Sequence, residues 1–238
     1  MILGLAAACW PPPAAAQVAF GIAGAADPPA VQSKADCLGI IFATIEDTNA
    51  VLVRVVDLEG PFTGTITAYG SNRMWTGRIE RATLVDLPYG GHEASVIVRA
   101  DGPIEGIEYA PAWGACTFHV GPISRNYYEA GRMSRPTLVL NDPQPASPVS
   151  CAHPYVSPAV TQAVEPQTPS NADAEGTVRI GVALDARGRV RSARVLSSPS
   201  ATLNPSAVAA ATRSEFTGAI FRCVAVPSAY PFGIGYNI

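Results

Sequence analysis

The sequence predicts a mainly β protein with a smaller α+β module at its C-terminal end. In residues 37–140, short β-branched and aromatic stretches alternate with Gly- and Pro-containing turns, and residues 172–238 follow the order strand, strand, helix, strand. A hydrophobic content of 48% with only 15% charged residues supports packed cores and argues against wholesale disorder. We therefore expect an N-terminal β-sandwich or small barrel, then a three-stranded antiparallel sheet with one helix.

Residues 1–26 carry no charge and are typical of a secretion signal. An apolar stretch from Ile2 to Trp10 precedes the small residues 14–16. The prolines at 11–13 interrupt the run, and a transmembrane helix needs about 20 continuous apolar residues. We expect an exported protein. The alternatives are a lipidated Cys9 or an anchor in the inner membrane.

The cysteines also indicate export. The five are Cys9, Cys37, Cys116, Cys151 and Cys223, and removal of the signal would leave four, which allow three pairings. Their grouping along the chain favours Cys37 with Cys116 and Cys151 with Cys223, each bridge contributing about 2–4 kcal/mol of stability. The alternative is four reduced core cysteines in a cytosolic protein. No CxxC spacing is present, so no zinc or thioredoxin-like motif is predicted.

The first β-rich block contains six predicted strands. Each is rich in β-branched or aromatic residues, and turns such as Glu59-Gly60-Pro61 and Asp101-Gly102-Pro103 separate them. The strands are predicted at residues 38–46, 50–58, 62–69, 82–87, 94–100 and 115–120. Residues 141–171 are then rich in Pro, Ser, Gln and Thr, which favours an extended, semi-rigid linker.

The last block predicts a hairpin, a helix and a final strand. Its first strand alternates at Val178, Ile180, Val182 and Leu184, the turn lies at 185–188, and the returning strand covers 190–196. Asn204 is a good N-cap, with Pro205 at the first helical position and Ala207, Val208 and Ala211 as a small apolar stripe. The final strand alternates at Phe232, Ile234, Tyr236 and Ile238.

The chain order fixes how these strands pair. The hairpin makes the first two strands antiparallel. The helix then returns the chain so that the third strand runs parallel to the second, and the third strand can therefore pair antiparallel with the first. The spatial order is then 2-1-3, and the terminal strand lies at a sheet edge with unpaired backbone groups.

At these residues the chain resembles the TonB C-terminal domain family over about residues 151–238. The features that carry the resemblance are Glu175-Gly176-Thr177-Val178, Asp185-x-x-Gly188-x-Val190, Val195-x-Ser197-Ser198, Leu203-Asn204-x-x-Ala207-Val208-x-Ala210 and Phe216. The resemblance implies a periplasmic binding module that pairs with an extended segment of a partner, such as an outer-membrane receptor. We expect the edge to be formed by Tyr230, Phe232, Gly233, Ile234, Gly235 and Tyr236.

Two further hypotheses follow from this resemblance. The chain is either a periplasmic adaptor that keeps the binding fold or a TonB-type energy transducer with an N-terminal membrane anchor. A second copy of the chain, exchanging strands, is an alternative partner.

The sequence offers no recognisable catalytic, cofactor or metal site. His92, His119 and His153 lack metal-ligand spacing, and no Gly-x-Ser-x-Gly elbow or phosphate-binding loop is present. A net charge of −3 does not favour nucleic acid as a partner. We expect a non-enzymatic protein without cofactor. A hydrolytic or glycan-active site in the first block is the less favoured alternative.

Overall fold

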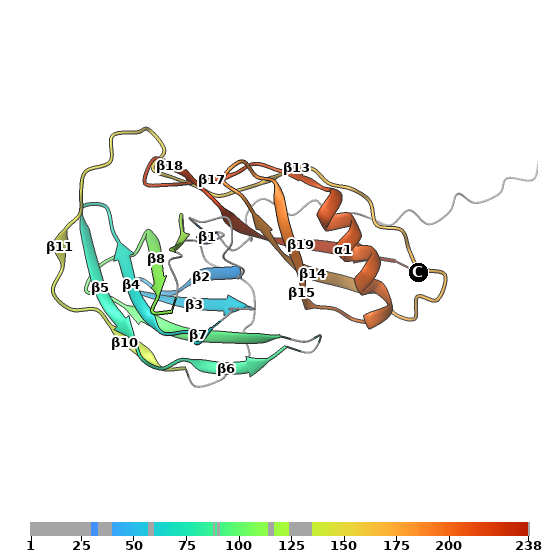
Figure 1. Ribbon diagram of the computed structural model, residues 1–238, viewed down its shortest axis with the longest axis horizontal. Helices are drawn as coiled ribbons and strands as arrows, with labels where there is room; N and C mark the ends of the chain where they lie inside the picture. Colours follow the sequence, from blue (N-terminus) through green and yellow to red (C-terminus); the bar gives the residue numbers. More distant parts are fainter. Residues whose placement is uncertain are drawn as a thin grey trace, which may run out of the picture.

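The computed structural model describes residues 30–32, 40–56, 60–87, 89, 91–113, 117–123 and 135–237. Over these residues the protein is mainly β, with several small sheets and one short α-helix. Figure 1 shows two lobes, a larger one built from the first part of the chain and a smaller one that carries the helix.

The larger lobe contains two sheets. The six-stranded sheet has the order β1-β9-β8-β4-β5-β11, and the other has the order β10-β7-β3-β2 with β6 also paired to β7. The strands of the first are β1 (Ala30–Gln32), β4 (Gly64–Tyr69), β5 (Arg73–Ile79), β8 (Gly106–Pro111), β9 (Phe118–Val120) and β11 (Gln144–Pro145). Those of the second are β2 (Ile40–Asp47), β3 (Ala50–Val56), β6 (Thr83–Asp86), β7 (His92–Arg99) and β10 (Thr137–Val139).

One hydrophobic core lies between the two sheets. Val53 and Val96 from one sheet and Ile66 and Tyr109 from the other are at most 2% exposed. Trp75 lies in the same core, and its indole N–H donates to Asp101 over 2.7 Å, so the buried ring keeps a hydrogen-bond partner. Two sheets around a shared core form a β-sandwich, one of the two architectures expected for this block.

Several strands of the sandwich were not predicted from the sequence. In β5, Trp75 and Ile79 are buried while Arg73 and Arg78 are exposed. Gly77 interrupts the alternation of apolar and polar side chains, so the strand is hard to recognise in the sequence. The structure has a glycine there because an added Cβ would lie 2.3 Å from Leu140 Cδ2. The strands β1, β8 and β10 are short and likewise give weak alternation. Tertiary pairing rather than local propensity therefore sets these strands.

The smaller lobe is built on the sheet β15-β14-β19. Its strands are β14 (Gly176–Leu184), β15 (Val190–Ser197) and β19 (Ser228–Tyr236), and β14 pairs antiparallel with both neighbours. This is the spatial order that the chain order predicted. The hairpin turn also lies where expected, with Gly188 at φ +82° and the Asp185 carboxylate accepting from the backbone N–H groups of Arg187 and Arg189.

The helix α1 (Asn204–Arg213) covers one face of this sheet. Ala207 and Ala211 of the predicted apolar stripe are fully buried against the strands, whereas Val208 is only partly buried. Ala210, which was not part of that prediction, is the third fully buried alanine of the helix. The predicted N-cap was wrong. Asn204 has helical angles as the first residue of α1, because the 3₁₀ turn η1 (Ala201–Leu203) runs directly into the helix and Ser200 caps that turn.

Short strands within the Pro-rich residues 141–171 pair with both lobes. β11 pairs with β5 of the sandwich, and two further short strands pair with unpredicted strands that follow α1. The pairs are β12 (Tyr155–Val156) with β17 (Ala219–Phe221) and β13 (Val160–Gln162) with β16 (Glu215–Phe216). β17 also forms a hairpin with β18 (Val224–Val226). This part of the chain therefore joins the lobes as a docked strap rather than as a free spacer.

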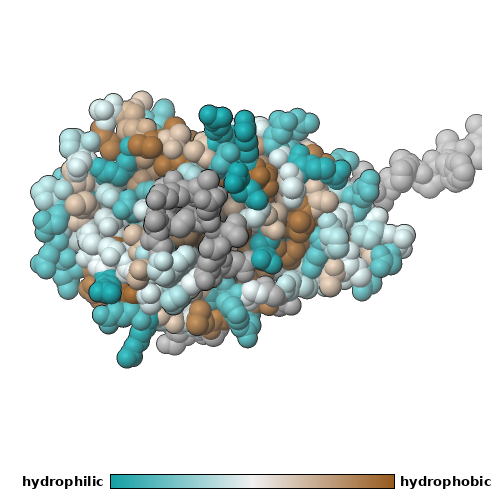
Figure 2. Space-filling model, viewed as in Figure 1, coloured by the Kyte–Doolittle hydropathy of each residue, from teal (hydrophilic) through white to brown (hydrophobic). Residues whose placement is uncertain are grey.

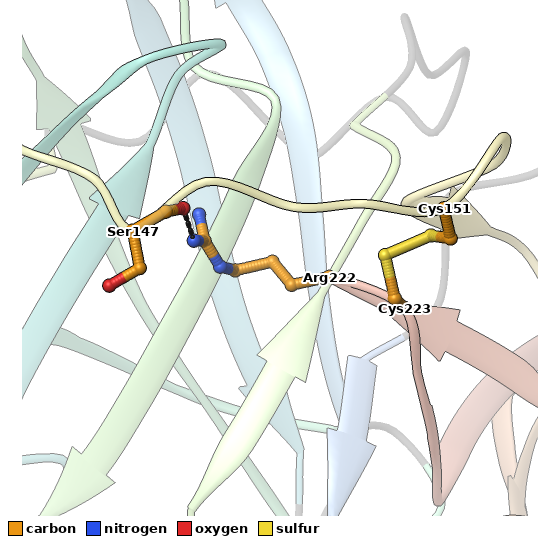
Figure 3. The surroundings of a disulfide bond; sticks show 4 residues. All are labelled: Ser147, Cys151, Arg222 and Cys223. Carbon is orange, nitrogen blue, oxygen red and sulfur yellow. Dashed lines mark hydrogen bonds between the residues drawn. A yellow bond between two sulfur atoms is a disulfide. The ribbon is translucent and has the colours of Figure 1, made fainter.

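A disulfide joins the strap to the β17–β18 hairpin (Figure 3). It links Cys151 to Cys223, 72 residues apart, and confirms one of the two predicted pairs. The other pair, Cys37 and Cys116, lies outside the described residues. The hairpin turn places Arg222 and Cys223 at φ +48° and +70°, a two-residue turn that normally favours Asn and Gly.

Contacts with the strap and with Tyr69 of β4 hold this turn in place. Arg222 donates to the Ser147 carbonyl and lies 4.6 Å from the Tyr69 ring centroid, while the Cys223 N–H donates to the Pro154 carbonyl over 3.2 Å. Figure 3 shows the Arg222 side chain extending toward Ser147 on the side away from the disulfide. A left-handed conformation costs about 1–2 kcal/mol per L-residue, so these contacts offset the cost of the turn.

The two lobes meet over the face of the small sheet opposite α1. Ile40, Phe42 and Val56 of the sandwich pack against Ala183, Leu196 and Ala229. The approach is close because Gly181 has no side chain, and a Cβ there would lie 3.0 Å from Ile40 Cδ1. The small sheet is therefore covered by the helix on one face and by the sandwich on the other.

A second contact between the lobes is aromatic. Phe221 and Tyr155 rest on glycines of the sandwich, where a Cβ on Gly106 would lie 2.8 Å from Phe221 and one on Gly121 would lie 2.7 Å from Tyr155. The Tyr69 ring packs edge-on against Phe221 with centroids 5.7 Å apart. Removing these side chains would leave the glycines uncovered.

The disulfide is expected to stabilise the folded chain. Replacing Cys151 and Cys223 together by Ser removes a cross-link that closes a 72-residue separation. The free energy of unfolding should fall by about 2–4 kcal/mol, because the cross-link restricts the unfolded chain. Guanidinium denaturation without reductant measures this change. Equal denaturation midpoints for the two proteins would show that the cross-link does not stabilise the fold.

The Asp173 carboxylate should make stability depend on acid pH. It accepts from the hydroxyls of Ser200 and Thr202 over 2.6 and 2.9 Å, and these bonds hold the pKa of Asp173 below its ordinary value. Its contribution is therefore complete above the unfolded-state pKa of about 3.9 and is lost as pH falls through the folded-state pKa. As the pH falls from about 5 to about 2, the free energy of unfolding of Asp173→Asn should decrease less than that of the wild type.

Urea denaturation at a series of pH values measures this difference. Asp142→Asn, at an exposed position of the strap, is the matched control and should follow the wild type. If Asp173→Asn and the wild type lose stability in parallel, the hydrogen bonds to Asp173 do not stabilise its charged form.

Candidate functional site

The outer edge of β19 is the candidate binding surface. β19 pairs with β14 along its whole length, from Ser228 opposite Leu184 to Tyr236 opposite Gly176. Within the described part of the chain, no backbone–backbone hydrogen bond joins β19 to any strand other than β14. Figure 1 shows β19 crossing the region where the lobes meet. Among the described strands, one edge of β19 therefore has no hydrogen-bonded neighbour, and such an edge can pair with an added strand.

The large side chains of β19 belong to the core. Phe232, Ile234 and Tyr236 are 4%, 0% and 0% exposed and pack with α1 and β14. The Tyr236 hydroxyl donates to the Leu203 carbonyl over 3.4 Å, and the half-buried Tyr230 ring lies 5.4 Å from that of Phe216. These four predicted site residues thus contribute their side chains to the core rather than to a surface for a partner.

Pro231 indicates which main-chain groups face outward. In an antiparallel pair, residues alternate between directing both N–H and C=O at the neighbouring strand and directing both away. Proline has no N–H and fits a strand where that group would face away from the neighbour. Gly233 and Gly235 lie two and four residues after Pro231, so their main-chain groups have the same direction as those of Pro231. We infer that the N–H and C=O groups of both glycines point away from β14.

Gly233 has room for a side chain on its own face of the sheet. An added Cβ on Gly233 would meet only Thr177 Cγ2, at an ordinary contact distance of 3.5 Å. Neither Gly233 nor Gly235 has a positive φ, so both hold an extended backbone suited to pairing. Of the six predicted site residues, Gly233 and Gly235 are therefore the two that can offer a partner both N–H and C=O groups.

β1 lies next to β19 but hydrogen-bonds to β9. A strand of three residues spans about 10 Å, whereas the nine residues of β19 span about 30 Å. Ala229, near the start of β19, is the residue held against β2. β1 can therefore lie beside only about a third of the outer edge.

The edge strand itself is electrically neutral. Residues 228–236 include no Asp, Glu, Lys or Arg. Burial raises the pKa of Tyr236 and of Tyr230, although the Val160 main chain partly offsets the shift at Tyr230, so both phenols stay protonated near neutral pH. Figure 2 shows hydrophobic residues in small separate patches on the face of the molecule turned toward the viewer. Recognition at this edge would therefore depend on main-chain hydrogen bonds rather than on charge.

Two of the three histidines each contact one carboxylate. His92 Nδ1 lies 2.7 Å from Asp86 on the exposed surface, and His119 Nε2 lies 3.1 Å from Glu108 beside the aromatic contact between the lobes. His153 is exposed on the strap. Among the residues that the structure describes, no group of three or more His, Cys, Asp or Glu side chains is arranged to hold a metal ion.

The chain matches no known family model, curated protein or solved structure. In the described ranges, no helix is long and apolar enough to cross a membrane.

A proline scan of β19 tests the direction of its main-chain groups. Gly235→Pro removes an N–H that points outward, so the free energy of unfolding should change by less than about 1 kcal/mol. Ile234→Pro removes an N–H that faces β14, and it should be less stable than Ile234→Ala by about 1–3 kcal/mol. Urea denaturation compares the variants. A strongly destabilised Gly235→Pro would mean that the Gly235 N–H faces β14 rather than the outer edge.

Proposed function

We propose that this protein is an exported, non-enzymatic binding protein whose outer β19 edge receives an extended segment of a partner protein. The observation that carries the proposal is the one-sided pairing of β19, which hydrogen-bonds to β14 and to no other described strand. A segment added at this edge would lengthen the three-stranded sheet by one strand. Recognition by strand addition obtains affinity from main-chain hydrogen bonds and demands few side-chain identities.

The energetics support a modest, reversible interaction. Gly233 and Gly235 together offer two N–H and two C=O groups, and each net hydrogen bond is worth about 0.5–1.5 kcal/mol. The sheet is already ordered by its core, because Ile234 and Tyr236 are fully buried. The binding strand therefore loses little conformational entropy on association, and most of that cost falls on the partner.

The resemblance of residues 151–238 to the TonB C-terminal domain family supports a particular class of partner. It favours the periplasm as the compartment and a segment of an outer-membrane receptor as the added strand. The Cys151–Cys223 disulfide is consistent with an oxidising compartment. A role in energy-coupled transport belongs to the same proposal. The sandwich lobe would then hold the sheet from its helix-free face and leave the edge for the partner.

Binding should depend on the N–H groups of the edge. The full chain, its Gly233→Pro/Gly235→Pro variant and its Gly233→Ala/Gly235→Ala variant would each be used to capture detergent-solubilised outer-membrane proteins. The alanine variant keeps both N–H groups and should retain the partner. The proline variant removes both and should bind at least about tenfold more weakly, a difference of about 1.4 kcal/mol.

Amide hydrogen exchange on the purified complex gives the second readout. The Gly233 and Gly235 amides should become protected when the partner is bound. If a partner binds the proline variant as tightly as the wild type, the edge is not the binding surface. Deletion of residues 233–238 is a poorer test, since it also removes the core residues Ile234 and Tyr236.

A further inference from the structure

The sandwich is open at the corner formed by β6 and the start of β7. Leu84 lies directly opposite Ala94 in this antiparallel pair, so their side chains share a face of the sheet. Ala94 is 4% exposed in the core between the sheets, yet Leu84 is 70% exposed. Leu84 therefore occupies a core-facing position that the described strands of the opposing sheet do not cover.

A pocket of about 550 Å³ lies at this corner. Its floor includes Val55, Phe62 and Ala94, which are at most 4% exposed and belong to the sandwich core. Ala82 and Leu84 line it closer to the surface. Pockets for small ligands typically have volumes of about 300–1,000 Å³ and mostly apolar walls. The size and the lining of this pocket both fall within that description.

The rim of the pocket carries charges of both signs. Glu80, Arg81 and His92 line it and are exposed, and His92 is hydrogen-bonded to Asp86 over 2.7 Å. A ligand head with a net charge would meet an opposing charge and a like charge on the same rim. An uncharged head with hydrogen-bonding groups meets no such repulsion, and Thr63 adds a hydroxyl to the lining.

We infer that this open corner binds a small uncharged amphiphile, with its hydrocarbon part on the apolar floor and its polar head at the rim. The site uses residues of the sandwich alone and none of β19. It would give the first lobe a ligand-binding role that is separate from strand addition at the edge. Binding would cover Leu84 and complete the corner of the core.

Titration with 1-octanol tests the inference directly. Methyl NMR spectra of the full chain would be followed for Ala82, Leu84 and Ala94 as the alcohol is added. We expect saturable shifts confined to the pocket, with octanoate and octylamine binding at least about threefold more weakly because each carries a charge. No saturable shift up to the solubility limit of octanol would overturn the inference, and equal binding of octanoate would overturn the preference for an uncharged head.

Two variants and a matched control locate the site. Ala82→Trp fills the pocket and should abolish binding, while Leu84→Ser, at an exposed position, should weaken it about three- to tenfold without unfolding the chain. Val139→Ser replaces a side chain that is 54% exposed on β10 of the same sheet, and it should bind octanol as the wild type does. Octanol binding that is unchanged in Leu84→Ser, or weakened equally in Val139→Ser, would place the ligand elsewhere.

Discussion

The arrangement of the whole molecule depends on the small residues of one face of the C-terminal sheet. Gly181, Ala183 and Ala229 let Ile40 and Phe42 approach the sheet closely. A side chain of ordinary size at Gly181 would push the sandwich away, since even a methyl group would lie 3.0 Å from Ile40 Cδ1. With α1 on the other face, both faces of the sheet are covered, and its edges are what remains for a partner.

The strap and the aromatic contact strengthen the same arrangement. The disulfide fixes the strap to the β17–β18 hairpin, and Phe221 and Tyr155 rest on glycines of the sandwich. Tyr89 of the sandwich also donates to the Ser198 carbonyl of the smaller lobe over 2.9 Å. Because β18 leads into β19 through Pro227, the contacts of the β17–β18 hairpin also restrain the start of the edge strand. The start of the edge strand is thus fixed by the disulfide and by packing contacts, which lowers the entropy cost of pairing with an added strand.

The sequence was informative where local patterns are strong. Alternation at Val178, Ile180 and Val182, the Asp185–Gly188 turn and the position of the helix are all found in the structure, because each has a local physical cause. β5, β8 and the strands of the strap were missed, since they are short or interrupted by glycine and are stabilised by distant partners.

The candidate site was predicted only in part. Its strand was identified, but alternation alone could not separate the core side chains of Phe232 and Tyr236 from the main-chain groups of Gly233 and Gly235. Pro231 could have separated them. A proline within a strand fits where the missing N–H would face away from the neighbouring strand, so it indicates which residues direct their main-chain groups outward. The pocket at Leu84 gave no sequence signal, since a leucine in an alternating strand predicts burial and the exposure depends on where the opposing sheet ends.

Amide hydrogen exchange of the free protein tests the central claim, an outer β19 edge whose main chain is unpaired. In residue-resolved NMR, we expect slow exchange for the amides of Phe232, Ile234 and Tyr236, which face β14, and fast exchange for those of Gly233 and Gly235. Slow exchange at both glycines in the free chain would contradict it, because their N–H groups would already be hydrogen-bonded within the protein.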